Sequence, residues 1–148
     1  MPINRDSDQG KAAVESLRLV PVTGVLDEAL RNRMIEIGKE RQQRIGGWTC
    51  GANCNMLSVA AADLFPDETR RTVGGFAYPP PGGERDGRPS AHVWFRLGEH
   101  YIDPTWERLG WDVALLRYFV AIEEQGLDGD EMLRRVRSYA KDNEIEFY

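Results

Sequence analysis

Apolar side chains repeat at helical spacing across residues 26–45, and charged residues occupy most positions between them. The repeating residues are Leu26, Leu30, Met34 and Ile37. This spacing predicts an amphipathic helix over that range, because it gathers the apolar side chains on one face. Gly46 and Gly47 follow the pattern and are expected to end the helix.

A second helical pattern follows these glycines. The helix is expected to begin near Cys50 or Asn53 and to run to about Phe65, where Pro66 stops it. Its apolar stripe consists of Cys50, Cys54, Leu57, Ala61 and Leu64. The two cysteines therefore share one helix face, where a disulfide would distort the backbone. Two reduced thiols are expected.

Patterns typical of strands occupy the middle of the chain. Residues 69–78 are predicted to form a strand, and residues 79–89, rich in proline and glycine, a surface loop that could flank an active site. Residues 91–103 predict a β-hairpin that turns at Gly98 and Glu99.

The two ends of the chain complete the expected architecture. Residues 1–22 are mostly polar and predict a loosely ordered N-terminal arm, while residues 111–124 and 130–141 are predicted to be helices. The order of elements indicates an α+β fold, with helices packed on a small antiparallel sheet. A chain of 148 residues is expected to form a single domain, spanning residues 1–148.

The hairpin makes a specific prediction about side chains. With a two-residue turn, Leu97 lies opposite His100 and Trp94 lies opposite Asp103. Alternation along the strands places one set on a polar face: His92, Trp94, Arg96, Tyr101 and Asp103. The apolar face carries Val93, Phe95, Leu97 and Ile102. His92 and Asp103 then become diagonal neighbours, about 7 to 8 Å apart at the backbone. A three-residue turn would separate them.

Charge and targeting signals narrow the classes of function. The net charge is -5 and no dense block of lysine and arginine occurs, so nucleic acid is not an expected partner. The first ten residues carry no apolar run typical of a secretory signal, and no stretch is long enough for a membrane span. A cytoplasmic protein without a membrane partner is expected, with export by a specialised secretion system left open.

Cysteine, histidine and aspartate occur in the chain order that thiol catalysis uses. Such catalysis needs a thiol, a base that removes its proton, and a third group that orients the base. Cys50, His92 and Asp103 are the candidates for these three parts. Cys50 is expected at a helix N-terminus, where the helix dipole stabilises a thiolate.

Two segments also resemble a known superfamily. The segment from His92 to Glu107 carries a His-x-Trp motif and then Asp-Pro-Thr-Trp, and it resembles the transglutaminase-like proteins of bacteria. The segment Gly47-Trp-Thr-Cys50-Gly-Ala-Asn-Cys54 is similar to the start of that family's catalytic helix. The resemblance implies a papain/transglutaminase-like fold in which an N-terminal catalytic helix packs on the sheet and helices follow at the C-terminus. It assigns Cys50, His92 and Asp103 as nucleophile, base and orienting acid.

A second resemblance concerns the oxyanion hole. The run of Cys50 to Cys54, with Gln43 upstream, resembles the papain-like double-glycine leader peptidases. In that group a glutamine helps to form the oxyanion hole, which would give this part to Gln43. The backbone N–H of Cys50 would be the other donor.

The expected reaction is acyl transfer without a cofactor or metal. The Cys50 thiolate would attack a carbonyl of a peptide or protein substrate, and the thioester would pass to water or to an amine. Hydrolysis by a cysteine protease or amidase is the default, because water needs no dedicated second site; a transglutaminase or deamidase reaction uses the same triad.

Several alternatives stay open at this point. Cys54 competes for the nucleophile's place, since Asn53 is a good N-cap and would put Cys54 in the first turn. A zinc site would use both cysteines with His92 and His100, although this spacing is atypical. The chain could also be a catalytically inactive binding module, or a toxin or effector deamidase.

Overall fold

The computed structural model describes residues 5–24, 28–41, 50–64, 70–80 and 88–147. Its centre is a five-stranded antiparallel sheet in the order β1-β5-β2-β3-β4. The strands are β1 Arg18–Val20, β2 Arg70–Tyr78, β3 Ser90–Leu97, β4 His100–Ile102 and β5 Arg117–Gln125. The helices are α1 Arg5–Glu15, α2 Glu28–Arg41, α3 Cys50–Leu64, α4 Pro104–Arg108 and α5 Gly129–Asp142, with a short 3₁₀ turn at Val113–Leu115.

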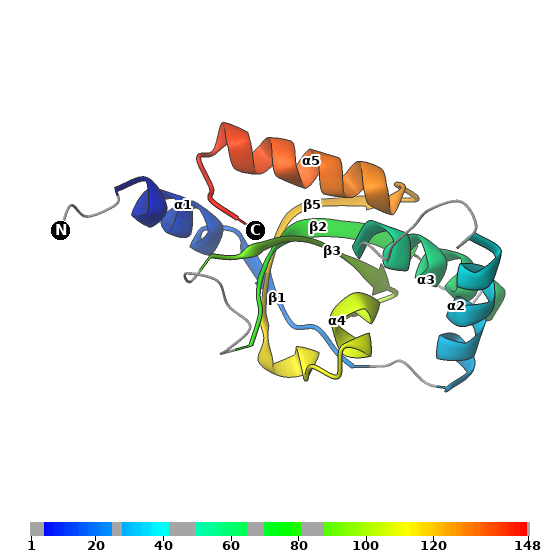
Figure 1. Cartoon of the computed structure of the whole chain (residues 1–148). Helices are drawn as coiled ribbons and strands as arrows, with labels where there is room; N and C mark the ends of the chain where they lie inside the picture. The colour runs from blue at the N-terminus through cyan, green and yellow to red at the C-terminus, as the bar shows by residue number, and fades with distance from the viewer. Residues whose placement is uncertain (1–4, 25–27, 42–49, 65–69, 81–87, 148) are drawn as a thin grey trace.

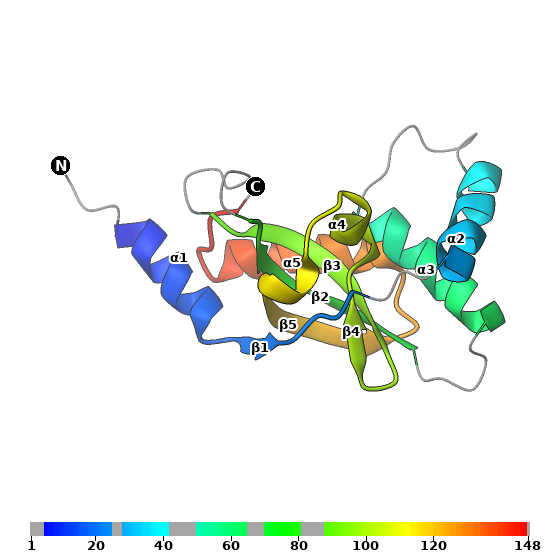
Figure 2. The same cartoon turned by 90° about the horizontal axis from the view of Figure 1, so that it is seen from below.

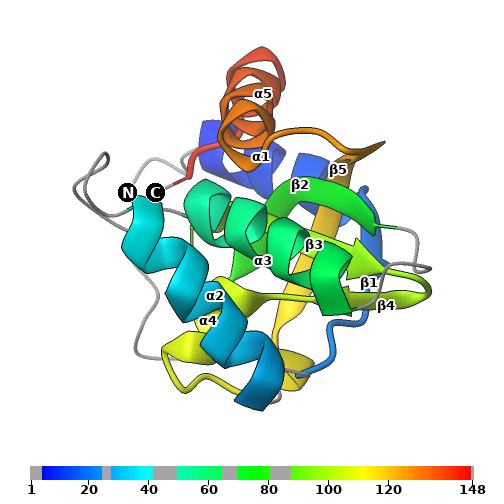
Figure 3. The same ribbon diagram turned by 90° about the vertical axis from the view of Figure 1, so that its right-hand side faces the viewer.

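Helices cover both faces of the sheet. α5 lies along one face and α4 lies on the other, while α3 packs between the sheet and α2 (Figures 1 and 3). The larger core fills the space under α3 and α5 and includes Leu57, Phe76, Phe95 and Met132. The smaller core, on the α4 face, comprises Val20, Val22, Val73, Ala77, Trp94, Tyr101, Trp106, Val113 and Tyr118. The candidate site lies on this second face.

An irregularity in β5 decides which side chains reach the smaller core. Gly74 pairs with Ile122 while the next residue, Gly75, pairs with Val120, so Ala121 is an extra residue in β5. This bulge reverses the alternation along β5. Tyr118 before it and Glu123 after it consequently lie on the same face of the sheet as Val73, the partner of Glu123.

The N-terminal segment connects the two edges of the sheet. β1 pairs with β5 at one edge, and Val22 then bridges to Tyr101 of β4 at the other edge. The Thr23 N–H also donates to the Tyr101 carbonyl over 2.8 Å. The chain from β1 to Thr23 thus crosses the smaller core, as Figure 2 shows from below.

The prediction of a loosely ordered arm over residues 1–22 is therefore wrong for the part that the structure describes. Residues 5–15 are helical and residues 18–20 form an edge strand. Local sequence gave little sign of this order, because the apolar residues of the segment occur in short patches rather than in a long periodic run. Its buried anchors Val14, Val20 and Val22 gain their stability from distant parts of the chain.

Most other predicted elements are confirmed. α2, α3, β2, the hairpin and α5 occupy the expected ranges within a few residues, and α3 begins at Cys50 rather than at Asn53. The α+β class with an antiparallel sheet is confirmed. The expected helix end at Gly46 and Gly47 lies outside the described residues.

The helix predicted over residues 111–124 is wrong, since β5 occupies most of it. The aromatic and β-branched residues from Tyr118 to Val120 favour a strand, and their side chains enter the two cores alternately. Because both faces of this strand carry apolar residues, the sequence lacks the strict alternation typical of a half-buried strand.

α4 was not predicted either. Asp103 caps its N-terminus and Pro104 occupies its first turn, an arrangement typical of helix starts.

Candidate active site

The hairpin brings His92 and Asp103 together. Leu97 pairs with His100 across the two-residue turn, and Gly98 adopts a φ of 60°, as expected at the first position of a type II′ turn. His92 Nε2 lies 2.8 Å from Asp103 Oδ2. Both side chains are buried, with 2% and 0% exposure. The contact predicted from the hairpin parity is confirmed.

Asp103 is fixed by the start of α4. Its Oδ1 accepts hydrogen bonds from the backbone N–H groups of Thr105 and Trp106, at 3.2 and 3.3 Å. Its Oδ2 accepts from the Tyr118 hydroxyl at 2.7 Å and faces His92. An ionised carboxylate only accepts hydrogen bonds, and every partner here can donate. The carboxylate is thus held in place from three sides.

Tyr118 is the site residue that the sequence analysis missed. Burial raises its pKa far above the ordinary value, and the Asp103 carboxylate raises it further. The phenol therefore stays protonated and donates to Asp103. Reading residues 117–122 as a strand would have placed Tyr118 and Val120 on one face, but the pairing with β2 that brings Tyr118 to the face of His92 has no local signal.

Small residues on β2 allow the rings of His92 and Tyr118 to lie close to each other. β2 lies between β3 and β5 in the sheet. On it, Gly75 pairs with His92 and Ala77 pairs with Tyr118. Neither residue carries a bulky side chain, so the aromatic rings from β3 and β5 approach each other across β2. The ring centroids of His92 and Tyr118 are 6.3 Å apart.

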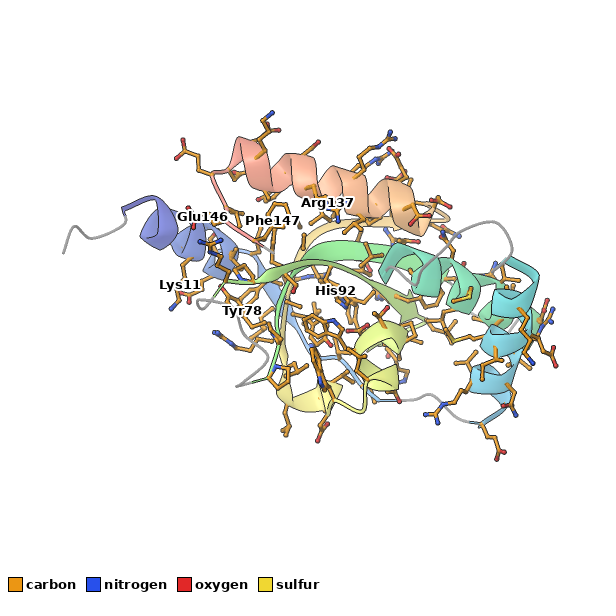
Figure 4. The ribbon with its side chains drawn as sticks, in the orientation of Figure 1. Lys11, Tyr78, His92, Arg137, Glu146 and Phe147 are labelled. Carbon is orange, nitrogen blue, oxygen red and sulfur yellow. The ribbon has the colours of Figure 1, made fainter. Side chains whose placement is uncertain are left out.

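Aromatic packing restricts the imidazole. The Trp106 indole of α4 stacks on His92, with centroids 4.3 Å apart and an angle of 22° between the planes. Trp94 lies nearby at 6.1 Å. Figure 4 shows His92 inside the molecule, between the sheet and α4. With Nε2 turned to Asp103, the ring presents Nδ1 as the nitrogen suited to face a thiol.

The first two turns of α3 contain both cysteines. Cys54 is 1% exposed, and its Sγ donates to the Trp94 carbonyl over 3.3 Å, two residues along β3 from His92. Cys50 is the first residue of α3, about 6 Å before Cys54 along the helix axis. The N-terminal end of α3 lies beside α4 in Figures 1 and 2. The side chain of Cys50 lies outside the described part of the structure.

Two further predictions have different outcomes. Gln43, the expected oxyanion donor, lies outside the described residues. His100 is exposed at the hairpin turn, where it pairs with Leu97. Leu97 lies five residues along β3 from His92, a distance of about 16 Å. A zinc site would require the two histidines to lie close together, and they do not. Across the described residues, no group of three or more His, Cys, Asp or Glu side chains is placed to bind a metal.

Comparisons with protein-family models, curated proteins and solved structures found no match for this chain. None of the helices in the described ranges combines the length and the apolar character needed to cross a bilayer.

Proposed function

We propose that this protein is a cysteine-nucleophile acyl-transfer enzyme that acts on an amide bond of a peptide or protein. The observation that carries the proposal is the buried contact of 2.8 Å between His92 and Asp103, beside a helix that begins at Cys50. A buried imidazole held by a carboxylate is the arrangement by which such enzymes orient a general base.

The reaction would proceed in two halves. His92 Nδ1 takes the proton of the Cys50 thiol, and the thiolate attacks the carbonyl carbon of the substrate. The C–N bond then breaks, and the imidazolium returns the proton to the departing amine, which leaves a thioester on Cys50. In the second half His92 takes a proton from water, the hydroxide releases the acid from sulfur, and the thiol is restored.

Each neighbour of the imidazole supports this sequence of proton transfers. Asp103 stabilises the imidazolium that forms when His92 accepts the thiol proton. Tyr118 keeps the carboxylate aimed at Nε2 through its hydrogen bond of 2.7 Å. Trp106 stacks on the ring and limits its rotation. The preorganised base would therefore lose little entropy on the way to the transition state.

The position of Cys50 favours it over Cys54 as the nucleophile. A thiolate is stabilised by the N-terminus of a helix, and Cys50 opens the 15-residue helix α3. Cys54 is buried and bonded to the backbone of β3, so a substrate carbonyl could not reach its sulfur without a local opening.

We infer a papain/transglutaminase-like arrangement for the fold. Its support is the order of parts: a helix that begins with cysteine, then antiparallel strands that carry histidine and aspartate. Water is the proposed acceptor of the thioester, since it needs no second binding groove. The same acyl-enzyme would serve deamidation or transamidation.

Limited labelling tests the proposal. The intact protein is treated with substoichiometric iodoacetamide at neutral pH, and the modified cysteine is located by mass spectrometry. The expected result is preferential modification of Cys50. His92→Gln and Cys54→Ser are compared with the wild type: the first should slow the labelling of Cys50, and the second should leave it unchanged. Equal, slow labelling of both cysteines would contradict the assignment.

An acyl-transfer readout separates a reactive thiol from an enzyme. With p-nitrophenyl acetate the wild type should give a burst of p-nitrophenol and an acetyl group on Cys50, because acylation precedes turnover. Cys50→Ser should abolish the burst. Absence of a burst together with unselective labelling would favour the catalytically inactive binding module.

A further inference from the structure

Three arginines surround one glutamate at the end of the sheet away from His92. Arg18 of β1, Arg71 of β2 and Arg96 of β3 lie 3.4, 3.7 and 3.2 Å, respectively, from carboxylate oxygens of Glu123 on β5. We call these three side chains the arginine cluster. Arg96 is four residues from His92 along β3, about 13 Å. The cluster is therefore separate from the candidate active site.

The charges in the cluster do not balance. Three guanidinium groups are always protonated at neutral pH, and Glu123 contributes a single negative charge. Glu99 also attracts Arg96 electrostatically, so the local excess is one to two positive charges, in a chain whose net charge is -5. Like charges held this close repel one another, so the arrangement would be stabilised by an anion.

The hydrogen-bond donors also exceed the acceptors. Arg71 Nε is buried and has no hydrogen-bond partner among the described residues, since 3.7 Å to Glu123 is beyond hydrogen-bonding distance. An N–H group that is buried without an acceptor costs free energy, which an added oxyanion would recover.

Neighbouring contacts hold the guanidinium groups in position. Arg18 Nη2 donates to the Tyr101 hydroxyl over 2.8 Å, and Arg96 Nε donates to the Gly98 carbonyl over 3.0 Å. The Arg96 guanidinium also lies 5.4 Å from the centre of the Tyr101 ring. The side chains of Arg18, Arg71 and Arg96 are 62%, 37% and 31% exposed, so a ligand could reach them from solvent.

We propose that the arginine cluster binds a phosphate monoester. A phosphate monoester carries a charge of about −1.5 to −2 at neutral pH, which is enough to neutralise the local positive excess. Its oxygens accept the paired N–H groups of guanidinium forks, a geometry that suits arginine in particular. The phosphate would belong to a small molecule or to a phosphorylated protein side chain. This site is independent of the cysteine chemistry proposed above.

Calorimetric titration of the whole protein tests this site. Inorganic phosphate at low ionic strength is the first probe, with sodium chloride at matched ionic strength as the control. Saturable binding of phosphate but not chloride is expected. Arg71→Gln should weaken binding by at least about tenfold, because it removes charge-assisted hydrogen bonds. Glu123→Gln should tighten binding, because it removes the competing carboxylate.

Arg135→Gln is the matched control variant. Arg135 is an ion-paired arginine too, bound to Glu124 and Glu131, and its substitution should leave phosphate affinity unchanged. Thermal unfolding without phosphate shows whether each variant folds. If Arg71→Gln does not fold, Arg96→Gln is used in its place. Phenyl phosphate represents a small-molecule ligand and a phosphoserine peptide represents a phosphorylated protein. The probe that resembles the natural ligand should bind more tightly than the other. Unsaturable binding, or equal affinity in Arg71→Gln and the wild type, would overturn the proposal.

Discussion

The carboxyl group of Asp103 binds helix α4 through Oδ1, and the His92 imidazole and the Tyr118 hydroxyl through Oδ2. Asp103→Asn separates these two contributions. The amide oxygen can still accept from the N–H groups of the first turn of α4, so the free energy of unfolding should fall by less than about 2 kcal/mol. The amide nitrogen is a donor, however, and would force His92 into the tautomer with hydrogen on Nδ1.

Acyl transfer by Asp103→Asn should therefore be roughly 10²- to 10⁴-fold slower, as expected for a base in the wrong tautomer. Urea denaturation and the p-nitrophenol burst measure the two effects. Asp103→Ala is the control, because it also removes the helix cap and should be the less stable variant. A normal burst in Asp103→Asn would show that the carboxylate does not orient the base.

Tyr118 is expected to act through Asp103 as a positioning residue. Tyr118→Phe keeps the ring that packs against Trp94, at a centroid distance of 5.2 Å, and removes only the hydroxyl. The rate of Cys50 labelling should fall by about 3- to 30-fold, because one of the several hydrogen bonds that orient the Asp103 carboxylate is lost. An unchanged rate, with an altered unfolding free energy, would leave Tyr118 a purely structural residue.

Tyr118 should also leave a signature in the alkaline stability. Its pKa in the folded protein is raised above the ordinary 10.0, so above pH 10 the unfolded chain loses this proton first. The free energy of unfolding should then decrease by about 1.4 kcal/mol per pH unit for each such tyrosine. Urea titrations between pH 9 and 11 should show a shallower decrease in Tyr118→Phe. A decrease of equal steepness would argue against the buried, protonated phenol.

The pairing of β2 with β5 depends on the small residue Gly75 in β2 and on the bulge at Ala121 in β5. A Cβ at Gly75 would lie 1.9 Å from the Phe119 carbonyl oxygen, whereas one at Gly24 would meet its nearest atom, on Glu107, at 3.5 Å. Gly75→Ala should lower the free energy of unfolding by more than about 3 kcal/mol, since backbone atoms must move. Gly24→Ala is the control and should change it by less than about 1 kcal/mol. Urea denaturation compares them; similar stabilities would show that the bulge adapts.

The elements that the sequence predicted well are those with local signals. The Gly98 turn and the alternation from His92 to Asp103 fixed the hairpin parity, and hence half of the candidate site. Tyr118 could not be placed in the same way. Its strand is apolar on both faces, and its partner Asp103 is set by pairing across β2 that no local pattern encodes.

For the molecule as a whole, the segment that joins the two sheet edges should matter for stability. Val20 points into the smaller core with 5% exposure, and the adjacent Leu19 is 56% exposed. Val20→Ala should lower the free energy of unfolding by about 2 kcal/mol, whereas Leu19→Ala should change it by less than about 0.5 kcal/mol. Chemical denaturation of both variants provides the comparison. Equal losses would mean that the segment is not part of the cooperative unit.

The position of β5 between β1 and β2 also has a consequence during synthesis. The first strand emerges from the ribosome early, but its partner is made after all the other strands. The hydrogen bond between Tyr118 and Asp103 can likewise form only after β5 has been synthesised. A nascent chain therefore carries Cys50 long before His92, its proposed base, is fully oriented. We expect the thiol to stay unreactive until translation has passed β5, which would protect the cell's own proteins from premature chemistry.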